Sequence, residues 1–446
     1  MLSQEDNEML ARTGRGTPMG ELFRRFWLPA LLSSDLPGPD SAPRRLRVLG
    51  EDLVAFRDSS GRIGIIDADC PHKLAPLYNG RNEEGGLRCA YHGWKFDVDG
   101  QCLEIPNLPE NYNTAALKQR VRLRAYPVRE AGGMAWVYMG PAGRTPELPG
   151  FEWTRVPPGH CHVASWLQCT NWAQGMEGEI DSSHISFLHR EFAPRAPMNG
   201  FVMVTARTPQ GTDDGAPVIT LKETDYGFIY GARRNNNSGK FYWRVTQWFL
   251  PMYSMIPNGE YPRSGRAWVP VDDHHVMVFN YTYRGDRPFT ADEMQYLDEG
   301  HSFPPPREPG QFELPDGYVI DCNLPLVNRA NNYRLDRVRQ KKANYSGIEV
   351  TTDQDRALQE NMPSGFGLAR GRIVDRSREM LVPSDLPVIT ARKSILNLAR
   401  NLQKGIEPRQ PHQGGLYDVL SMSALSPEAG FEEFVAAHTG QTRAIF

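Results

Sequence analysis

The chain has 446 residues, 40% of them hydrophobic, which is enough to form the cores of more than one domain. Lysine and arginine total 50 against 53 aspartates and glutamates, and the net charge of −3 argues against nucleic-acid or anionic-membrane partners. The chain lacks an apolar run of the roughly 18 residues that a membrane span needs. Its acidic start, Met1 to Asp6, does not resemble a signal peptide, so a cytoplasmic protein is expected.

The first third of the chain predicts a helical lead-in and a small β domain. Apolar residues at helical spacing predict a short helix over 19–28, which ends before Pro29. From about 40 to 140, short apolar runs alternate with turn residues, which predicts antiparallel strands. Turn formers between Pro141 and Gly150 indicate a boundary. We therefore expect a lead-in over 1–30 that packs on the last domain, a β domain over 31–142 and a larger domain over 143–446.

The larger domain is predicted to mix helices and strands. We expect a helix around 171–190, five strands at 218–222, 228–232, 241–250, 266–270 and 275–284, and helices near 291–298, 352–361 and 389–403. Strands bracketed by helices favour an α+β domain over a doubly wound one. The proline-rich segment 301–310 is expected to be a surface loop, with a lid over a pocket as the alternative.

Two half-sites near the start of the chain have metal-ligand spacing. Cys70-Pro71-His72 is followed, after sixteen residues, by Cys89-Ala90-Tyr91-His92. This is the ligand pattern of a Rieske [2Fe–2S] cluster, in which two thiolates hold one iron and two imidazoles hold the other. A structural zinc takes similar ligands, but zinc fingers usually pair two cysteines in one knuckle. The pattern favours the cluster. The other cysteines are expected to be reduced core thiols: Cys102, Cys161, Cys169 and Cys322.

A second candidate metal motif is D-x2-H-x4-H, formed by Asp181, His184 and His189. Two histidines five residues apart lie about 140° apart around a regular helix, so both reach one metal only where the helix ends, bulges or kinks. Beside a cluster motif, the pair favours a non-haem iron held by two histidines and one carboxylate. Asp355 is the predicted carboxylate ligand, with Asp353 as the alternative. Both lie at the start of a predicted helix. Without a metal, Asp353 would be its N-cap and Asp355 a first-turn partner of the helix dipole; with a metal, one of them is expected to cap the helix while the other binds.

The whole chain resembles the oxygenase α subunits of Rieske non-haem iron aromatic ring-hydroxylating dioxygenases. Within that family it is most similar to phthalate 4,5-dioxygenase-like enzymes and to the phenoxybenzoate and chlorobenzoate dioxygenase subgroup. The similarity rests on the two metal motifs and on the sequence of the segments 16–22, 81–89, 177–189 and 375–377. The resemblance implies a helix-grip catalytic domain, in which helices cover an antiparallel sheet. It also implies that Cys70, His72, Cys89 and His92 bind the cluster, and that His184, His189 and Asp355 bind iron.

The resemblance also implies a route for electrons and a reaction. Electrons pass from NAD(P)H through a separate reductase, expected to be of the FMN/[2Fe–2S] type, to the cluster and then to the iron of a neighbouring subunit. Both atoms of O2 are then added to adjacent ring carbons. Asp181 is expected to bridge two imidazoles across the subunit boundary and to hold their tautomers; otherwise it orients His184 within one subunit. A homotrimer or a hexamer is expected.

Relatives in this subgroup act on aromatic carboxylates, which implies a guanidinium in the pocket as a carboxylate clamp. The candidates are Arg207 and Arg244, which lie in segments with a strand-like sequence pattern, and Ser182 is a further pocket residue. Each arginine could instead be an ordinary strand residue paired at the surface. Arg233 and Arg234 precede an asparagine-rich turn and are expected to face solvent.

The predicted function is cis-dihydroxylation of a phthalate-type aromatic carboxylate, with O-demethylation or monooxygenation of a substituted benzoate as the alternative. A pure electron carrier would not need the second metal motif or the roughly 300 residues beyond the cluster. The chain departs from the family twice. Lys73-Leu74-Ala75-Pro76 replaces the Arg-Gly-Ala-Ser of many relatives, and the segment 362–372 is longer than expected.

Overall fold

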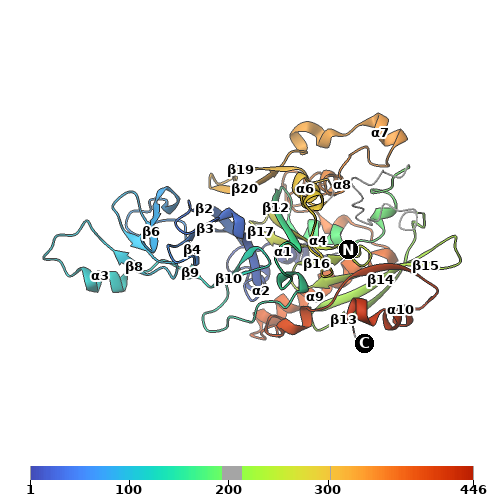
Figure 1. Cartoon of the computed structure of the whole chain (residues 1–446), viewed down its shortest axis with the longest axis horizontal. Coiled ribbons are helices and arrows are strands. Elements are labelled where there is room, and N and C mark those ends of the chain that lie inside the picture. Colours follow the sequence, from blue (N-terminus) through green and yellow to red (C-terminus); the bar gives the residue numbers. More distant parts are fainter. Residues whose placement is uncertain (1, 193–212, 302, 445–446) are drawn as a thin grey trace.

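The computed structural model describes residues 2–192, 213–301 and 303–444. Figure 1 shows a small β module at one end of the long axis and a larger sheet with its helices at the other. The module contains one four-stranded antiparallel sheet of order β2-β3-β4-β9 and a second of order β5-β6-β7-β8. Their bounds are β2 Arg44–Val48, β3 Glu51–Arg57, β4 Ile63–Asp67, β5 Arg81–Glu83, β6 Gly86–Arg88, β7 Lys95–Phe96, β8 Cys102–Glu104 and β9 Ala125–Tyr126, with helix α3 at Thr114–Arg120.

The larger part is built on an eight-stranded antiparallel sheet. Its order is β12-β18-β17-β16-β15-β14-β13, and β21 pairs with β15. The bounds are β12 Cys161–Gln168, β13 Val218–Thr224, β14 Gly227–Asn235, β15 Phe241–Phe249, β16 Tyr253–Ile256, β17 Arg263–Pro270, β18 Val276–Tyr283 and β21 Met422–Ser426. Two smaller sheets complete the fold: β1 Trp27–Leu32 with β11 Met134–Tyr138 and β10 Val128–Ala131, and the hairpin of β19 Arg307–Glu313 and β20 Val319–Pro325.

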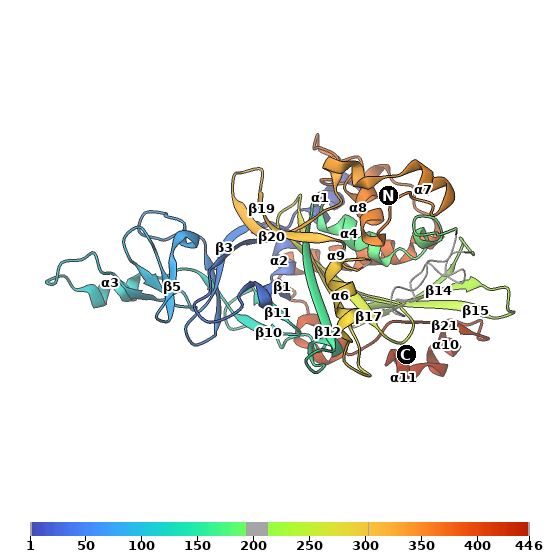
Figure 2. The same cartoon turned by 45° about the horizontal axis from the view of Figure 1, so that its top comes forward.

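Helices cover the large sheet (Figure 2). Helix α4, Trp172–Ile180, packs on β16 and β17, and α9, Leu386–Gln403, packs on β13 and β14. Helix α10, Phe431–Ala437, packs in a separate core cluster with Trp243 and Val245 of β15. The other helices are α1 Gln4–Ala11, α2 Pro18–Phe23, α6 Ala291–Glu299, α7 Arg337–Lys342, α8 Thr351–Gln359 and α11 Thr439–Thr442. The predicted α+β class, with antiparallel sheets and helices, is confirmed. None of the described helices combines the length and the apolar character of a membrane span.

Three local expectations need correction. The helix predicted over 19–28 ends at Phe23, and Trp27–Leu32 is a strand whose six residues are all buried. Its Pro29 lies at an irregularity in the pairing with β11, where a missing N–H is tolerated. The helix predicted around 171–190 ends at Ile180. The 301–310 segment is not simply a surface loop, because Arg307–Glu313 forms a strand and Phe303 is buried. The expected domain boundaries stay predictions.

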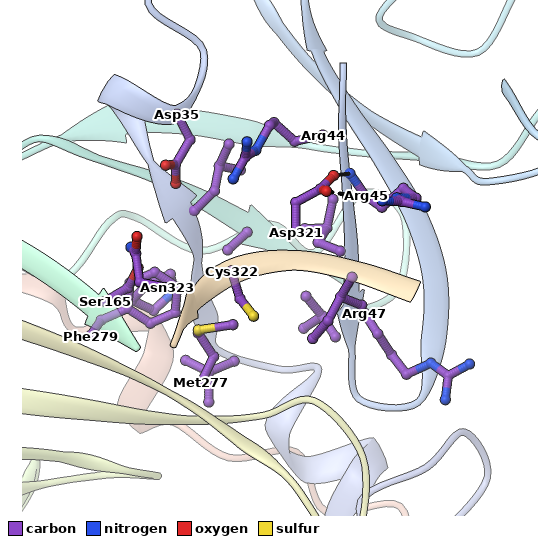
Figure 3. A pocket seen from close by; sticks show the side chains of 17 residues that line it. Asp35, Arg44, Arg45, Arg47, Ser165, Met277, Phe279, Asp321, Cys322 and Asn323 are labelled. Atoms are coloured by element: carbon purple, nitrogen blue, oxygen red, sulfur yellow. Dashed lines mark hydrogen bonds and ion pairs between the residues drawn. The ribbon is translucent and has the colours of Figure 1, made fainter. Parts of the chain in front are cut away.

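The β module meets the larger part through β2 and β20. The backbone amide of Arg45 donates to Asp321 at 2.8 Å, and the Arg45 guanidinium pairs with the same carboxylate at 3.1 Å (Figure 3). Beside this pair lies a cavity of about 30 Å³ whose lining includes Asp35 and Asn323. That volume holds about two water molecules, so the cavity is a small gap in the seam between the two parts, lined by both apolar and polar side chains.

A buried ion cluster anchors helix α4. Glu177 accepts from Arg376 at 2.9 Å and from Arg392 at 2.8 Å, and both guanidiniums are nearly inaccessible to solvent. Burial alone would raise the pKa of Glu177, but the two arginines outweigh it and lower this pKa to about 2. The cluster therefore ties α4 to the C-terminal segment and to α9.

Replacing Glu177 by Gln should destabilise the protein by about 3–5 kcal/mol at neutral pH, because two buried guanidiniums lose their shared counter-charge. The folded-state pKa lies below the ordinary value of 4.5, so the stabilisation is present above pH 4.5 and is lost as the pH falls towards 2. The free energy of unfolding, measured with urea, should differ between wild type and variant at pH 4.5, and this difference should become smaller as the pH falls towards 2. Glu379→Gln is the matched control, since Glu379 pairs with Arg392 at 2.6 Å but is partly exposed. Equal losses in both variants would contradict the argument.

Candidate metal centres and substrate pocket

The two cysteine-histidine half-sites form loops of the same construction in the β module. The amides of Leu74 and Gly93 donate to the carbonyls of Cys70 and Cys89 at 2.9 and 3.0 Å. Each loop therefore turns back on its own cysteine. Gly93 and Leu74 both adopt positive φ, at 76° and 56°. Because the left-handed conformation costs a leucine about 1–2 kcal/mol, the loop carries strain at Leu74 that a glycine would avoid.

The side chains of these loops fit the predicted cluster. Cys70 and Cys89 are buried, and burial together with the neighbouring Cys89 thiol raises the pKa of Cys70 to about 11. Two adjacent thiolates would therefore require a cationic group such as iron beside them. The imidazole rings of His72 and His92 lie 4.5 Å apart, and His72 stacks on Trp94 at 4.6 Å. His72 Nδ1 is buried without a hydrogen-bond partner in the described part of the chain, as expected for a ligand atom.

The second motif lies at the end of helix α4. Asp181 is the residue that follows the helix, with extended backbone angles of −86° and 108°, and His184 begins a short 3-10 turn. Both histidines thus lie outside the regular helix. The helix end removes the obstacle that a five-residue spacing would impose.

His184, His189 and Asp355 converge, with one ligand atom from each within 4.8 Å of the others. The two Nε2 atoms are 3.0 Å apart, and Asp355 Oδ1 lies 3.2 Å from His189 Nε2 and 3.7 Å from His184 Nε2. Adjacent ligands of an octahedral ion with bonds of about 2.1 Å are about 3 Å apart. The donor set therefore fits one face of an octahedral metal such as non-haem iron.

The Nδ1 atoms of both imidazoles have partners that leave Nε2 free. His184 Nδ1 lies 3.5 Å from Asp181, and His189 Nδ1 lies 2.7 Å from Gln354 Oε1. Burial opposes charge on His184, but Asp181 outweighs it and raises the pKa of this imidazole. At His189, burial prevails and lowers the pKa. A proton on Nδ1 leaves the Nε2 lone pair available to a metal.

Asp353, the alternative ligand, points elsewhere. It is fully buried and pairs with Arg356 at 3.0 Å, and burial raises its pKa to about 7. The residue that precedes helix α8 is Val350, which offers no side-chain cap. The expectation that one of the two aspartates caps this helix is therefore wrong, because both side chains are used in the interior.

The pocket beside the three converging residues is lined by α4, the following turn, β14 to β17 and α8. Its lining includes Glu179, Asp181, Ser182, Tyr230, Arg244, Thr246, Asn258, Arg266, Phe303 and Asp355. Side chains alternate along a strand. Because Trp243 and Val245 pack in the α10 cluster, Arg244 between them faces the pocket. The residue is 4% exposed, and its Nε and Nη1 atoms are buried without a hydrogen-bond partner among the described residues.

The other candidate substrate residues have different surroundings. Ser182 lines the pocket, and its carbonyl and hydroxyl accept from Arg234. Arg234 is fully buried, not solvent-facing as expected, because it lies on the same face of β14 as Tyr230. Burial and the neighbouring Arg244 lower the pKa of Arg234 to about 10. Arg207 lies outside the described residues.

Several pocket residues escaped prediction from the sequence. Arg266 pairs with Glu179 at 2.5 Å and lies under the ring of Phe303 at 4.6 Å. Gln354 orients His189, and Asn258 lines the pocket. Glu179, two residues before Asp181, carried a positional signal. Asn258 and Phe303 carried none, because loops distant in sequence bring them to the pocket.

Comparison with protein families assigns both halves of the chain. The Rieske [2Fe–2S] domain matches residues 26–127, and the family described as "LigXa C-terminal domain like" matches residues 137–413. The second match alone covers more than half of the chain. The first match supports the cluster, and the described residues hold the His/His/Asp group expected for a mononuclear iron.

Curated relatives match along most of their length. The chain is 37% identical over 413 residues to the 3-chlorobenzoate-3,4-dioxygenase oxygenase subunit of Comamonas testosteroni, covering 90% of this chain and 89% of the relative. It is 36% identical over 411 residues to the phthalate 4,5-dioxygenase oxygenase subunit of Pseudomonas putida, covering 91% and 88%.

The fold agrees with these matches. The crystal structure of dicamba monooxygenase bound to dicamba superposes with a TM-score of 0.54 at 16% identity, covering 86% of this chain and 98% of that one. At this identity the likeness concerns the fold alone. Together with the two family matches and the full-length relatives, the converging histidines and aspartate place this chain in the family of Rieske non-haem iron aromatic ring-hydroxylating oxygenases.

Proposed function

We propose that this chain is a terminal oxygenase that cis-dihydroxylates an aromatic carboxylate of the phthalate type with O2. The observation that carries the proposal is Arg244, a buried guanidinium without a partner among the described residues, in the same pocket as the predicted iron ligands. A buried cation of this kind needs an anion, and a planar fork of donors matches a carboxylate. The chlorobenzoate and phthalate relatives support this substrate class.

The cluster would be held by Cys70, His72, Cys89 and His92, and the iron by the His184, His189 and Asp355 triad. When bound, the cluster supplies single electrons and the iron supplies the activation of O2. The residues of the chain hold and orient the reactants. Arg244 would anchor the carboxylate, and the ring would then extend from β15 towards Asp355. Phe303 would cover the ring and exclude water.

The proposal extends to electron delivery. The cluster loops lie in the module at one end of the molecule, and α4 and α8 lie in the larger part (Figure 1). This separation supports transfer from the cluster of one subunit to the iron of its neighbour, in a homotrimer or a hexamer. Asp181 would carry the contact, because its carboxylate lies behind His184 and 26% of its side chain is accessible. A separate FMN/[2Fe–2S] reductase would supply the electrons.

The function is tested with the iron-loaded protein, a compatible reductase, NADH, 18O2 and a panel of aromatic acids that includes phthalate. We expect both labelled atoms in a dihydrodiol, detected as its mass. Loss of a methyl group from methoxylated acids, or a single added oxygen, would instead identify an O-demethylase or monooxygenase. Absence of any oxygenated aromatic acid would contradict the proposed substrate class.

Replacing Arg244 by Ala should lower kcat/KM for a carboxylate substrate by about 100-fold, because the buried anion loses its guanidinium. The corresponding neutral carboxamide should lose much less. Arg233→Ala is the matched control, since Arg233 is only half-buried, donates to the Ala429 carbonyl and stacks on Phe241. Steady-state kinetics on the acid and the amide make the comparison. Equal losses on both compounds would reduce Arg244 to a structural residue.

Replacing Asp181 by Asn should keep both metal centres and slow electron transfer between them by about 10- to 100-fold, because the amide cannot serve as an anionic bridge. Iron content and the cluster absorbance report the centres. Rapid mixing of substrate-bound, reduced enzyme with O2 reports cluster oxidation. Ser183→Ala removes one hydrogen bond to the same carboxylate, at 2.8 Å, but keeps its charge, and should have a small effect. Cluster oxidation at the wild-type rate in the Asn variant would rule out the bridge.

A further inference from the structure

A second buried donor lies in the pocket beside Arg244. Asn258 follows strand β16, and only 4% of this residue is exposed. Its Nδ2 atom is fully buried and has no hydrogen-bond partner within residues 2–192, 213–301 and 303–444. Buried amide groups in native proteins are almost always hydrogen-bonded. We therefore expect the Nδ2 donor of Asn258 to bind an acceptor that is not among the described residues.

Strand pairing brings Asn258 next to Arg244. Ser423 of β21 lies directly opposite Arg244 of β15. The hydroxyl of Ser423 accepts a hydrogen bond from the amide of Gly259 at 2.9 Å, which ties the loop that carries Asn258 to this pair of strands. Both Asn258 and Arg244 then line the pocket that contains Asp355. The two unsatisfied donors belong to one corner of the site.

Arg244 and Asn258 together offer more hydrogen-bond donors than the two oxygens of one carboxylate require. A guanidinium presents N–H groups in a planar fork, and two of them match the two oxygens of a single carboxylate. Arg244 alone can therefore bind the carboxylate of an aromatic acid. The amide of Asn258 remains, and a donor left unpaired in a buried site is costly. A substrate with one more oxygen at this edge of the ring would satisfy it.

We propose that Asn258 is a specificity-determining residue that donates a hydrogen bond to a second oxygen acceptor of the substrate, beside the carboxylate held by Arg244. The inference rests on the proposed function and narrows its substrate class. The preferred compounds are aromatic carboxylates that carry another carboxylate, carbonyl, hydroxyl or ether oxygen. A site with a buried donor discriminates strongly against an isostere that lacks the acceptor.

Isosteric pairs test the proposal without turnover. Acetylbenzoate and isopropylbenzoate, each substituted at position 2, 3 or 4, differ mainly in the acceptor oxygen. Their affinities are measured by calorimetry with the anaerobic, iron-loaded protein in the absence of reductase. At one ring position, wild type should bind the acetyl compound at least about tenfold more tightly than the isopropyl compound. In Asn258→Leu this preference should vanish, while isopropylbenzoate keeps its affinity.

Matched variants distinguish loss of the Asn258 hydrogen bond from a general loss of folding. Asn323→Leu makes the same substitution at the seam cavity of Figure 3, outside the iron pocket, and should keep the preference. Asn258→Ala repeats the test if the leucine variant does not fold, with the cluster absorbance as the check on folding.

Each outcome decides between the two proposals. A wild type that binds both members of every pair equally, or a preference that survives in the Asn258 variants, overturns the role of Asn258 and leaves the proposed function intact. A wild type that binds none of these acids and no phthalate overturns the aromatic-carboxylate proposal as well.

Discussion

The packing of α4 against α8 is the constraint on which the iron site depends. His184 and His189 follow α4, whereas Asp355 lies within α8, so the three side chains meet only if the two helices keep their relative position. Buried amides provide this link. Gln168, at the end of β12 just before α4, donates to the side chain of Gln359 of α8 at 2.6 Å, and Gln174 of α4 donates to the Gln359 carbonyl at 3.4 Å. Directional hydrogen bonds of buried groups specify a position that apolar contacts alone would not.

The pocket combines this rigid frame with unsatisfied polar groups. Arg266 and Glu179 satisfy each other's charge, but Arg244 and Asn258 are not paired with any described residue. Leaving such groups buried lowers stability, and proteins retain that cost where binding requires it. The ion cluster of Glu177 with Arg376 and Arg392, on the other side of α4, instead raises the stability of the fold. Helix α4 thus joins the Glu177 cluster on one side and lines the pocket with Glu179 on another.

The distribution of the two centres over the chain has a mechanical consequence. The cluster loops belong to small sheets at the end of the molecule, and the iron site belongs to the large sheet with its helices (Figure 1). The seam between the parts, where Arg45 binds Asp321, keeps the module in a defined orientation. A module held in this way keeps His72 and His92, both only half-buried, in a fixed orientation relative to the larger part. Leu74, next to them in the chain, has positive φ and is 74% exposed.

The sequence by itself determined the family and the fold class, because the C-x-H and C-x2-H half-sites and the D-x2-H-x4-H motif are local in the chain. Several strand and helix positions also followed from periodicity. The fully buried strand Trp27–Leu32 resembled a helix, however, the helix expected to 190 ends at Ile180, and the strand Arg307–Glu313 was expected to be a loop. Only the tertiary structure shows that Asp355 lies beside the two histidines whereas Asp353 pairs with Arg356, since this depends on which side of α8 faces α4. It likewise decided that Arg234 is buried and that Asn258 joins Arg244. Those contacts arise from pairing between strands and loops far apart in sequence, which no local pattern records.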